Sequence, residues 1–426
     1  MKEELFSPEE AMPSEEREQY YNERVKQVVE FAYQNAPAVK SKLDKAGVKP
    51  SQIRTTRDLE LIPTITRDEI IELQRVNPPY GGLLAVPVES LYRFIYSPGP
   101  LYVPLGSTEY AKSARKILFA MGLRRGDTVI LSMPNLYMAG ASVEDAMILD
   151  GIVCISAGTG NTELQMTMMH DLGIKGYIGT PTFLMNMVRK AEESGYNFRK
   201  DFKLQYALVW GEPLLPEVRN TLENDHGIRL TDGLGVGVGL DLGFYCGQRN
   251  GFHITEEQFV EIVEPETGKQ LPPGEVGALL VTGFSNDAFP MIRYMTGDLS
   301  SLITEPCPCG RTSPRITGIM GRVGDSLKVR ALYLTSGQVK TVAEKFPMIA
   351  NYQVIVSREG YKDKLTFNLE LADESIDRDR FLKELQSNFQ DVCRVRVDKI
   401  NVVTRGTIPE ERKVLKDDRD WQIKTS

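Results

Sequence analysis

The sequence predicts an α/β fold with a large N-terminal domain of mostly parallel sheets flanked by helices, a small β-barrel-like part, and a small mobile α+β C-terminal domain. Three observations lead to this prediction. Short apolar segments alternate with helical segments from residue 110 to residue 233, the alternation stops near residue 250, and the residues after 321 follow a different order. Strands buried between two layers of helices produce the first pattern.

The chain opens with helical periodicity. Residues 18 to 38 are predicted to form a helix because apolar side chains recur at helical spacing from Tyr21 to Ala32. The helix should end near Asn35, since Pro37 disfavours helix at the residue before it.

Five apolar segments then have the length and composition of buried strands. They are expected at residues 127–133, 151–156, 175–180, 206–211 and 228–233. Stretches of helical composition separate them, so the strands should lie parallel in one sheet. Ligands of such sheets bind beyond the carboxyl ends of the strands, where the loops gather.

The pattern changes twice after residue 250. Two strands joined by a Gly/Pro-rich connection come first, in FVEIVEP and ALLVTGF. A compact α+β unit follows, with helices at 336–346 and 378–390 and strands at 351–357, 364–371 and 394–403. We therefore divide the chain into residues 1–321 and 322–426. The hinge is expected at Arg322–Lys328, whose glycine and charged residues suit an exposed linker.

Composition limits the partners of the protein. The net charge is −7 and the pI about 5.4, which disfavours a nucleic-acid partner. The N-terminus lacks the apolar core of a signal peptide, and no apolar run approaches the roughly 20 residues that cross a bilayer. An odd number of cysteines, five, without a secretory signal argues for a reducing cytoplasm. We expect a cytoplasmic protein without a membrane partner.

Four soft ligands predict a structural zinc site. Cys307 and Cys309 form a tight C-x-C turn, and Cys246 and His253 lie close together on a glycine-containing loop. In a reducing compartment these two pairs can complete a closed tetrahedral site. The alternative is a pair of buried thiols with a histidine at the surface.

Several segments of the chain resemble phenylacetate–coenzyme A ligases. The opening stretch FAYQNAPAVKSKLDKAGVKP and the following IRTTRDLELIPTITRDEI are similar to the start of that family. Further similar segments occur in the family's order: GNTELQ, GTPTFL, WGEPLLPEVRNTLE, PMIRYMTGD and ITGIMGRVGDSLK. The C-x-C-G-R pattern around Cys307 matches the family as well. Together the matches cover nearly the whole chain, and their combination is far more specific than any single one.

The resemblance implies an AMP-forming ligase. Members of the family adenylate a carboxylic acid, usually phenylacetate or a related aryl acid, with ATP and Mg²⁺, and then pass the acyl group to the thiol of coenzyme A. Asp298 matches the position that binds the ribose hydroxyls, and Arg322 the arginine near the ribose and the hinge. The alternative for both is a surface turn or a structural ion pair. Further positions on the nucleotide side match Glu212, Gly235, Ser97 and Gly99.

Three departures from the family predict impaired or altered ATP-dependent adenylation. The stretch that matches the family's SSGTTGKP phosphate loop is Ser97–Pro104, in which two prolines lack donors and Val103 replaces the lysine. Leu234–Val238 matches Y-G-x-T-E, so the Mg²⁺-facing glutamate becomes a valine. The C-terminal GTIPEERKVLKDDR lacks the segment with the catalytic lysine, for which Lys413 and Lys416 are weak substitutes.

Three classes of function therefore stay open. The first is an AMP-forming ligase of an aryl or other organic acid and coenzyme A. The second is a repurposed acyl-CoA-binding, nucleotide-binding or scaffold protein that kept the fold. The third is transfer of an already activated acyl group. The sequence leaves a homodimer open and does not identify the acid.

Overall fold

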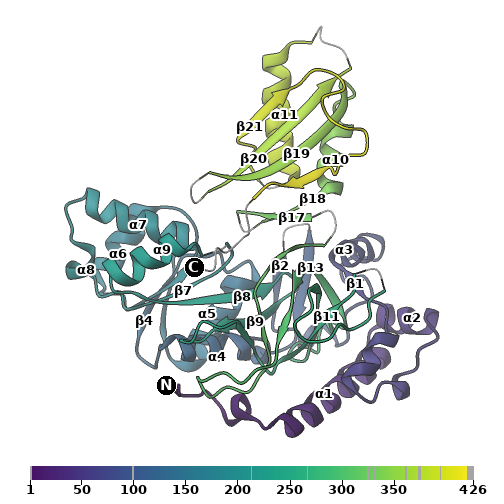
Figure 1. Ribbon diagram of the computed structural model, residues 1–426, viewed down its shortest axis with the longest axis vertical. Helices are drawn as coiled ribbons and strands as arrows, with labels where there is room; N and C mark the ends of the chain where they lie inside the picture. Colours follow the sequence, from purple (N-terminus) through teal and green to yellow (C-terminus); the bar gives the residue numbers. More distant parts are fainter. Residues whose placement is uncertain are drawn as a thin grey trace. The chain divides into compact units, whose positions relative to one another are not determined.

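The computed structural model describes residues 2–97, 100–212, 214–265, 267–323, 326–330, 332–359, 362–372, 376–393 and 395–419. The chain divides into two compact units, Met1–Ile319 and Met320–Ser426, which Figure 1 colours from purple to green and from green to yellow. The division falls beside the break expected at Gly321. Independent movement of the second unit stays a prediction.

A nine-stranded sheet forms the centre of the first unit, with the order β14-β15-β10-β9-β8-β7-β6-β4-β5. Its parallel half fits the predicted strands closely, because each short apolar segment forms one strand. These strands are β4 (Thr128–Leu131), β5 (Val153–Ser156), β6 (Gly176–Gly179), β7 (Tyr206–Val209) and β8 (Arg229–Val236).

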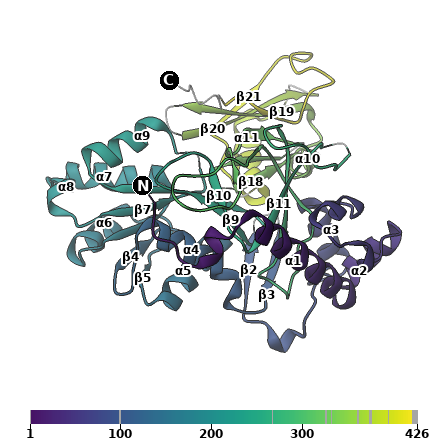
Figure 2. The same ribbon diagram turned by 60° about the horizontal axis from the view of Figure 1, so that its bottom comes forward.

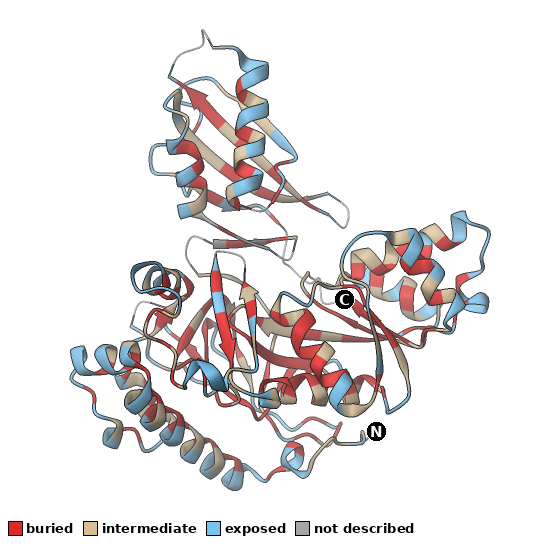
Figure 3. Ribbon diagram, turned by 180° about the vertical axis from the view of Figure 1, so that it is seen from behind, coloured by how far each residue is buried: buried red, intermediate tan, exposed pale blue. Residues whose placement is uncertain are grey.

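Helices cover both faces of this parallel half. Val129 and Leu131 of β4 belong to one apolar core and Ile130, between them, belongs to the other, because successive side chains of a strand point to opposite faces. Figure 3 shows the buried strands between helices with exposed outer surfaces. The first core includes α4 (Lys112–Met121) and α5 (Met138–Asp150), and the second includes α6 (Thr162–Asp171), α7 (Pro181–Glu193), α8 (Phe198–Asp201) and α9 (Pro216–Asn220).

The sheet continues in antiparallel strands beyond β8. The glycine-rich run GLGVGVG has the composition of a flexible loop, but its first half belongs to a strand. Gly233–Val236 complete β8 by pairing with β9 (Leu240–Tyr245), and only residues 237–239 form the turn, where Gly239 has φ of +94°. Three short strands follow: β10 (Phe252–Ile254), β15 (Arg315–Ile316) and β14 (Leu302–Ile303).

A second sheet of this unit has the order β1-β13-β12-β11. The two strands predicted after residue 250 are its β11 (Gln258–Val263) and β12 (Gly277–Gly283), which pair antiparallel. The other members are β13 (Tyr294–Ser300) and β1 (Ile65–Thr66). A separate hairpin consists of β2 (Arg93–Ser97) and β3 (Leu101–Leu105).

The N-terminal helices lie along the outside of the first unit (Figure 2). They are α1 (Ser14–Asn35), α2 (Pro37–Lys45) and α3 (Arg67–Val76), and α1 ends at Asn35 as predicted. A buried ion network ties α1 to the core. Arg17 lies 2.9 Å from Glu256, and Lys116 lies 2.6 Å from Glu256 and 2.8 Å from Glu257.

The second unit is the expected α+β unit. Its sheet has the order β21-β20-β19-β22, and the apolar core contains Phe367, Leu385 and Phe389. The elements are β16 (Gly321–Arg322), β17 (Ser326–Val329), β18 (Leu332–Thr335), α10 (Ser336–Glu344), β19 (Ile349–Glu359), β20 (Lys362–Leu371), α11 (Arg378–Cys393), β21 (Lys399–Val402) and β22 (Leu415–Asp417).

The α/β fold class predicted from the sequence is confirmed. The expected hinge at Arg322–Lys328 contains the start of β17, and its Gly324 and Asp325 lie outside the described residues. No helix in the described part of the chain is long and apolar enough to cross a membrane.

Candidate nucleotide site and cysteine–histidine centre

The parallel strands present their carboxyl ends at one edge of the large sheet, where ligands of open α/β sheets bind. Glu212 follows β7 at this edge. Its Oε1 accepts a hydrogen bond of 2.7 Å from the backbone N–H of Thr182, in the first turn of α7, whose N-cap is Thr180. Glu212 therefore lies at the predicted nucleotide edge with one oxygen already bound to the helix start.

Gly235 lies on β8 directly opposite Asp241 of β9. The Asp241 carboxylate is 3% exposed, one of its oxygens has no hydrogen-bond partner among the described residues, and burial raises its pKa to about 7. Burial also raises the pKa of Asp232 to about 7, against the opposing effect of Arg219 at 4.0 Å. Carboxyl groups that titrate near neutrality occur often at functional sites.

Asp232 and Asp241 were not among the residues singled out from the sequence. The only signal was a charged residue inside each of two apolar runs, IRLTDG and GLDLGF. Such a residue is usually exposed. The pairing of β8 with β9 buries Asp241, whereas Asp232 pairs with Val209 of β7 and its side chain stays 17% exposed.

The two residues assigned to the ribose lie in different units. Asp298 is on β13 and 6% exposed, and its backbone N–H donates to Thr296 Oγ1 over 3.0 Å. Arg322 is on β16 at the start of the second unit. Their joint role at a nucleotide stays a prediction.

The β2–β3 hairpin carries the stretch that matches the phosphate loop. Ser97 ends β2 and is buried, while Pro98 and Gly99 lie outside the described residues. Val103, at the position of the family's lysine, is fully buried and lies against Gly239. Val238, at the position of the Mg²⁺-facing glutamate, is 2% exposed. Both positions that the sequence matched to charged residues of the family thus carry buried apolar side chains, and the loss of those charged groups stays a prediction.

The two lysines considered for catalysis belong to the second unit and are exposed. The carbonyl of Lys413 accepts a hydrogen bond from Gln353, and Lys416 Nζ lies 2.9 Å from a carboxylate oxygen of Asp418. Their part in the reaction stays a prediction.

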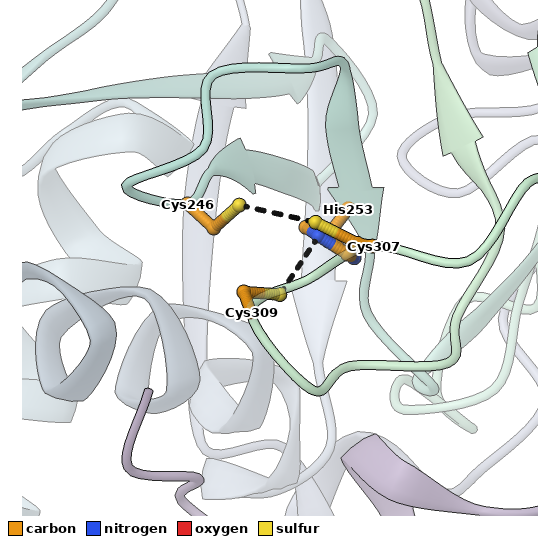
Figure 4. A group of neighbouring side chains, drawn as sticks. All are labelled: Cys246, His253, Cys307 and Cys309. Carbon is orange, nitrogen blue, oxygen red and sulfur yellow. Dashed lines mark hydrogen bonds between the residues drawn. The ribbon is translucent and has the colours of Figure 1, made fainter. Parts of the chain in front are cut away.

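The four predicted metal ligands come together beside the antiparallel half of the large sheet (Figure 4). Cys246 directly follows β9 and His253 is on β10, so the turn between two paired strands brings them close. Cys307 and Cys309 lie in the loop before β15, which pairs with β10. All four side chains are buried, and their candidate ligand atoms lie within 4.8 Å of one another.

The distances in this cluster suit a tetrahedral ion. The Sγ atoms of Cys246 and Cys307 are 3.6 Å apart, and Cys309 Sγ is 3.4 Å from His253 Nε2. Zn–S bonds of about 2.3 Å and Zn–N bonds of about 2.0 Å place tetrahedral ligands about 3.5 to 3.8 Å apart. The other ring nitrogen of His253 lies 3.3 Å from Ser313 Oγ, an outer partner that fixes the ring.

The Cys309 sulfur is prepared for metal binding. Hydrogen bonds from Cys246 and His253 and from the backbone N–H of Arg311 lower the pKa of the Cys309 thiol, which favours the thiolate. The thiolate is the form of cysteine that binds metals.

The N-terminal segment, residues 2–12, packs over this cluster. The backbone N–H of Glu3 donates to the carbonyl of Cys309 over 2.8 Å, and its carboxylate accepts from the N–H of Gly247. Arg311, beside Cys309, lies 2.7 Å from both Glu3 and Glu10. This segment had no periodic signal in the sequence and was not predicted to contact the cysteines.

Comparison with known proteins places the chain in a class. Residues 109–286 match the model of the AMP-binding enzyme family, and residues 336–419 match that of the AMP-binding enzyme C-terminal domain. A crystal structure of 2-hydroxyisobutyryl-CoA ligase with 2-HIB-AMP and CoA superposes with a TM-score of 0.89, at 24% identity, covering 97% of this chain and 92% of that one. The protein is therefore an adenylate-forming enzyme.

Curated relatives identify the family. The phenylacetate–coenzyme A ligase of Thermus thermophilus is 30% identical over 95% of both chains, and that of Escherichia coli is 28% identical over 95% of this chain and 94% of its own. This chain belongs to the phenylacetate–coenzyme A ligase family. The family and the enzyme class predicted from the sequence, an AMP-forming acid–CoA ligase, are confirmed, and a non-catalytic scaffold is not favoured.

Proposed function

We propose that this enzyme activates an aryl or other organic carboxylic acid with ATP and Mg²⁺ and transfers the acyl group to coenzyme A. The acid oxygen attacks the α-phosphorus of ATP and releases pyrophosphate, giving the acyl adenylate. The thiol of coenzyme A then attacks the acyl carbon and releases AMP. The observation that carries the proposal is a likeness to phenylacetate–coenzyme A ligases over 95% of the chain, across both units.

The residues at the nucleotide edge support binding and orientation. Asp298 offers an acceptor-only carboxylate that suits the two ribose hydroxyls, and Glu212 holds the start of α7. The positive dipole end of α7 favours the Glu212 carboxylate itself, which keeps this side chain in place at the nucleotide edge.

The phosphate contacts are altered in our proposal. Val103 and Val238 are buried and cannot neutralise a triphosphate or hold Mg²⁺. Asp241 is a buried carboxylate on the glycine-rich β8–β9 hairpin, opposite Gly235, and we assign it as the candidate replacement for the missing acidic ligand. Loss of one charged group at such a site typically lowers the rate about 10²- to 10³-fold.

Acid-dependent AMP release tests the function. Purified enzyme with ATP, Mg²⁺, coenzyme A and a panel of aryl and short-chain acids should release AMP for at least one acid. The matched control is Asp298→Ala, which should lose about 10²-fold or more of that rate. AMP release equal to that of the control for every acid would contradict the proposal, and acyl transfer without ATP would support the transferase alternative instead.

Pyrophosphate exchange tests the altered phosphate contacts separately. We expect exchange about 10²- to 10³-fold slower than that of a family member with the complete SSGTTGKP loop. Exchange within tenfold of that member would show that the hairpin holds ATP as well as the usual loop does.

We also propose that Cys246, His253, Cys307 and Cys309 bind a structural zinc ion. Four buried soft donors at tetrahedral spacing support this proposal, and a set with four protein ligands leaves no position for a substrate. The proposal requires reduced thiols, as in the cytoplasm.

Metal analysis of protein purified without added zinc tests the site. About one equivalent per chain is expected, as is typical of closed sites. The variant Cys309→Ser should lose the metal, while Cys154→Ser, which changes a cysteine outside the cluster, should keep it. Less than about half an equivalent in the unaltered protein would contradict a structural role.

A further inference from the structure

The N-terminal segment holds the loop that carries two of the four cysteine–histidine ligands. This loop, residues 304–314, joins β14 to β15 and contains no helix or strand. The backbone N–H of Glu3 donates to the carbonyl of Cys309 over 2.8 Å. In the opposite direction, the backbone N–H of Thr312 donates to the carbonyl of Glu10 over 2.9 Å. An irregular loop at the centre is thus fixed by the start of the chain.

Arg311 joins the same loop to both ends of the segment. Its guanidinium is buried and lies 2.7 Å from the carboxylates of Glu3 and Glu10. Its backbone N–H lies 3.4 Å from the sulfur of Cys309 and donates to it. A single residue therefore contacts a ligand sulfur through its backbone and the segment through its side chain. Undocking of the segment would leave this buried charge without its partners.

The middle of the segment is anchored on α4, a helix that carries none of the four ligands. The Phe6 ring meets Phe119 edge-on, with ring centroids 5.6 Å apart. The Arg115 guanidinium lies 5.2 Å from the centroid of the Phe6 ring. A substitution of Phe6 can therefore weaken docking of the segment without changing a ligand or a residue that bonds to one.

The docked segment also closes the centre to solvent. The four ligand residues are only 0% to 7% exposed. Glu3 bridges the two ligand-bearing loops, because its carboxylate accepts from the N–H of Gly247, next to Cys246, while its own N–H donates to Cys309. Groups buried in this way are reached from solvent only through local opening.

We propose that docking of the N-terminal segment and metal binding at the cysteine–histidine centre are coupled, so that the segment is a lid that retains the ion. This coupling presupposes the zinc site proposed above. An ion bound to Cys307 and Cys309 fixes the loop to which the segment bonds. Without the ion the loop has more conformations to lose when the segment docks. Linkage is reciprocal, so a docked segment strengthens metal binding by the factor by which the metal strengthens docking.

Chelator competition with the zinc-loaded full chain tests the lid. Phe6→Ala removes the anchor on α4, and Glu3→Gln weakens the bonds to the loop. Each variant should weaken zinc affinity at least about 5-fold, the lower end of typical coupling factors, and should lose zinc faster to an excess of chelator. Glu4→Gln is the matched control. It changes the next residue in the same way, but the pair of Glu4 with Arg124 is exposed, so zinc affinity should stay unchanged.

The reciprocal measurement follows the segment instead of the metal. Hydrogen exchange of residues 2–12 in the unaltered full chain should become at least about 5-fold faster when zinc is removed. Exchange of α7, which packs in the second apolar core, should not change. This comparison separates undocking of the segment from unfolding of the whole unit.

Two results would overturn the coupling and leave the zinc site standing. One is equal zinc affinity in the unaltered protein, Phe6→Ala and Glu3→Gln. The other is exchange of residues 2–12 that does not respond to zinc removal. An unaltered protein that binds no zinc would overturn the coupling and the zinc site together. If Phe6→Ala melts well below the unaltered protein, Glu3→Gln decides, because it leaves the apolar packing in place.

Discussion

Replacing Lys116 by methionine should destabilise the protein by about 3 kcal/mol at neutral pH. The Lys116 ammonium is 1% exposed and lies 2.6 Å from Glu256 and 2.8 Å from Glu257, which are themselves 2% and 4% exposed. Removing one partner of a buried ion pair typically costs about 3–5 kcal/mol because the remaining charge is buried without compensation. The lower end of this energy range applies because each glutamate keeps a second cation. Arg17 stays 2.9 Å from Glu256, and Lys112 stays 3.5 Å from Glu257.

Urea unfolding at pH 7 measures this loss of free energy. The matched control is Lys40→Met, which breaks an exposed pair with Asp44 and should cost less than about 1 kcal/mol. Adding Glu256→Gln and Glu257→Gln to the Lys116 variant should recover part of the loss, because the uncompensated charges disappear. A loss equal to that of the Lys40 variant would refute the reasoning.

The same variant has a defined pH dependence. Burial acts to raise the pKa of Glu256, but Lys116 and Arg17 outweigh it and hold the pKa below its usual value of 4.5. A carboxyl with a lowered folded pKa stabilises the protein above its unfolded pKa, and this contribution is lost as the pH falls through the folded value. The difference between the unaltered protein and the variant should therefore shrink below pH 4.5.

Two other substitutions give independent checks. Because burial raises the folded pKa of Asp241 to about 7, the folded protein keeps a proton that the unfolded carboxyl releases from near pH 4 upward, and stability falls as the pH rises to 7. Asp241→Asn should remove this decline and stabilise the protein at pH 8 by up to about 4 kcal/mol, with no gain at pH 3 in thermal unfolding. Ser313→Ala removes the outer partner of His253 and should weaken zinc binding about 10- to 100-fold in a chelator competition, whereas Ser301→Ala should not. The first assignment would be contradicted if the stability of Asp241→Asn depended on pH as that of the unaltered protein does. The second would be contradicted if Ser313→Ala bound zinc as tightly as the unaltered protein.

Local patterns in the sequence were sufficient for most of the fold. The apolar segments of the parallel sheet predicted their strands because each strand is short and buried on both faces, as in Gly176–Gly179. Pro37 predicted the end of α1 because its effect on the preceding residue is local. The four residues of the cysteine–histidine cluster were recognisable as a group because their residue types are rare in this chain and spaced in two pairs.

Hairpins whose strands are rich in glycine or proline were missed. Gly233–Val236 has the composition of a loop and forms a strand only because β9 supplies its hydrogen-bond partners. The β2–β3 hairpin has short strands, and three prolines lie in or between them. The alternation of side chains that normally predicts a strand was therefore not recognisable. Burial of Asp241 follows from the same β8–β9 pairing. These contacts are close in sequence, but the glycines and prolines hide the composition that normally predicts a strand.

The N-terminal segment imposes an order on biosynthesis. Glu3 and its partner Arg311 are 308 residues apart, so Glu3 is synthesised long before its partner near the end of the first unit. At about 5–20 residues per second this interval lasts roughly 15–60 s. Until Arg311 is synthesised, the ion pairs with Glu3 and Glu10 that hold the segment over Cys309 cannot form.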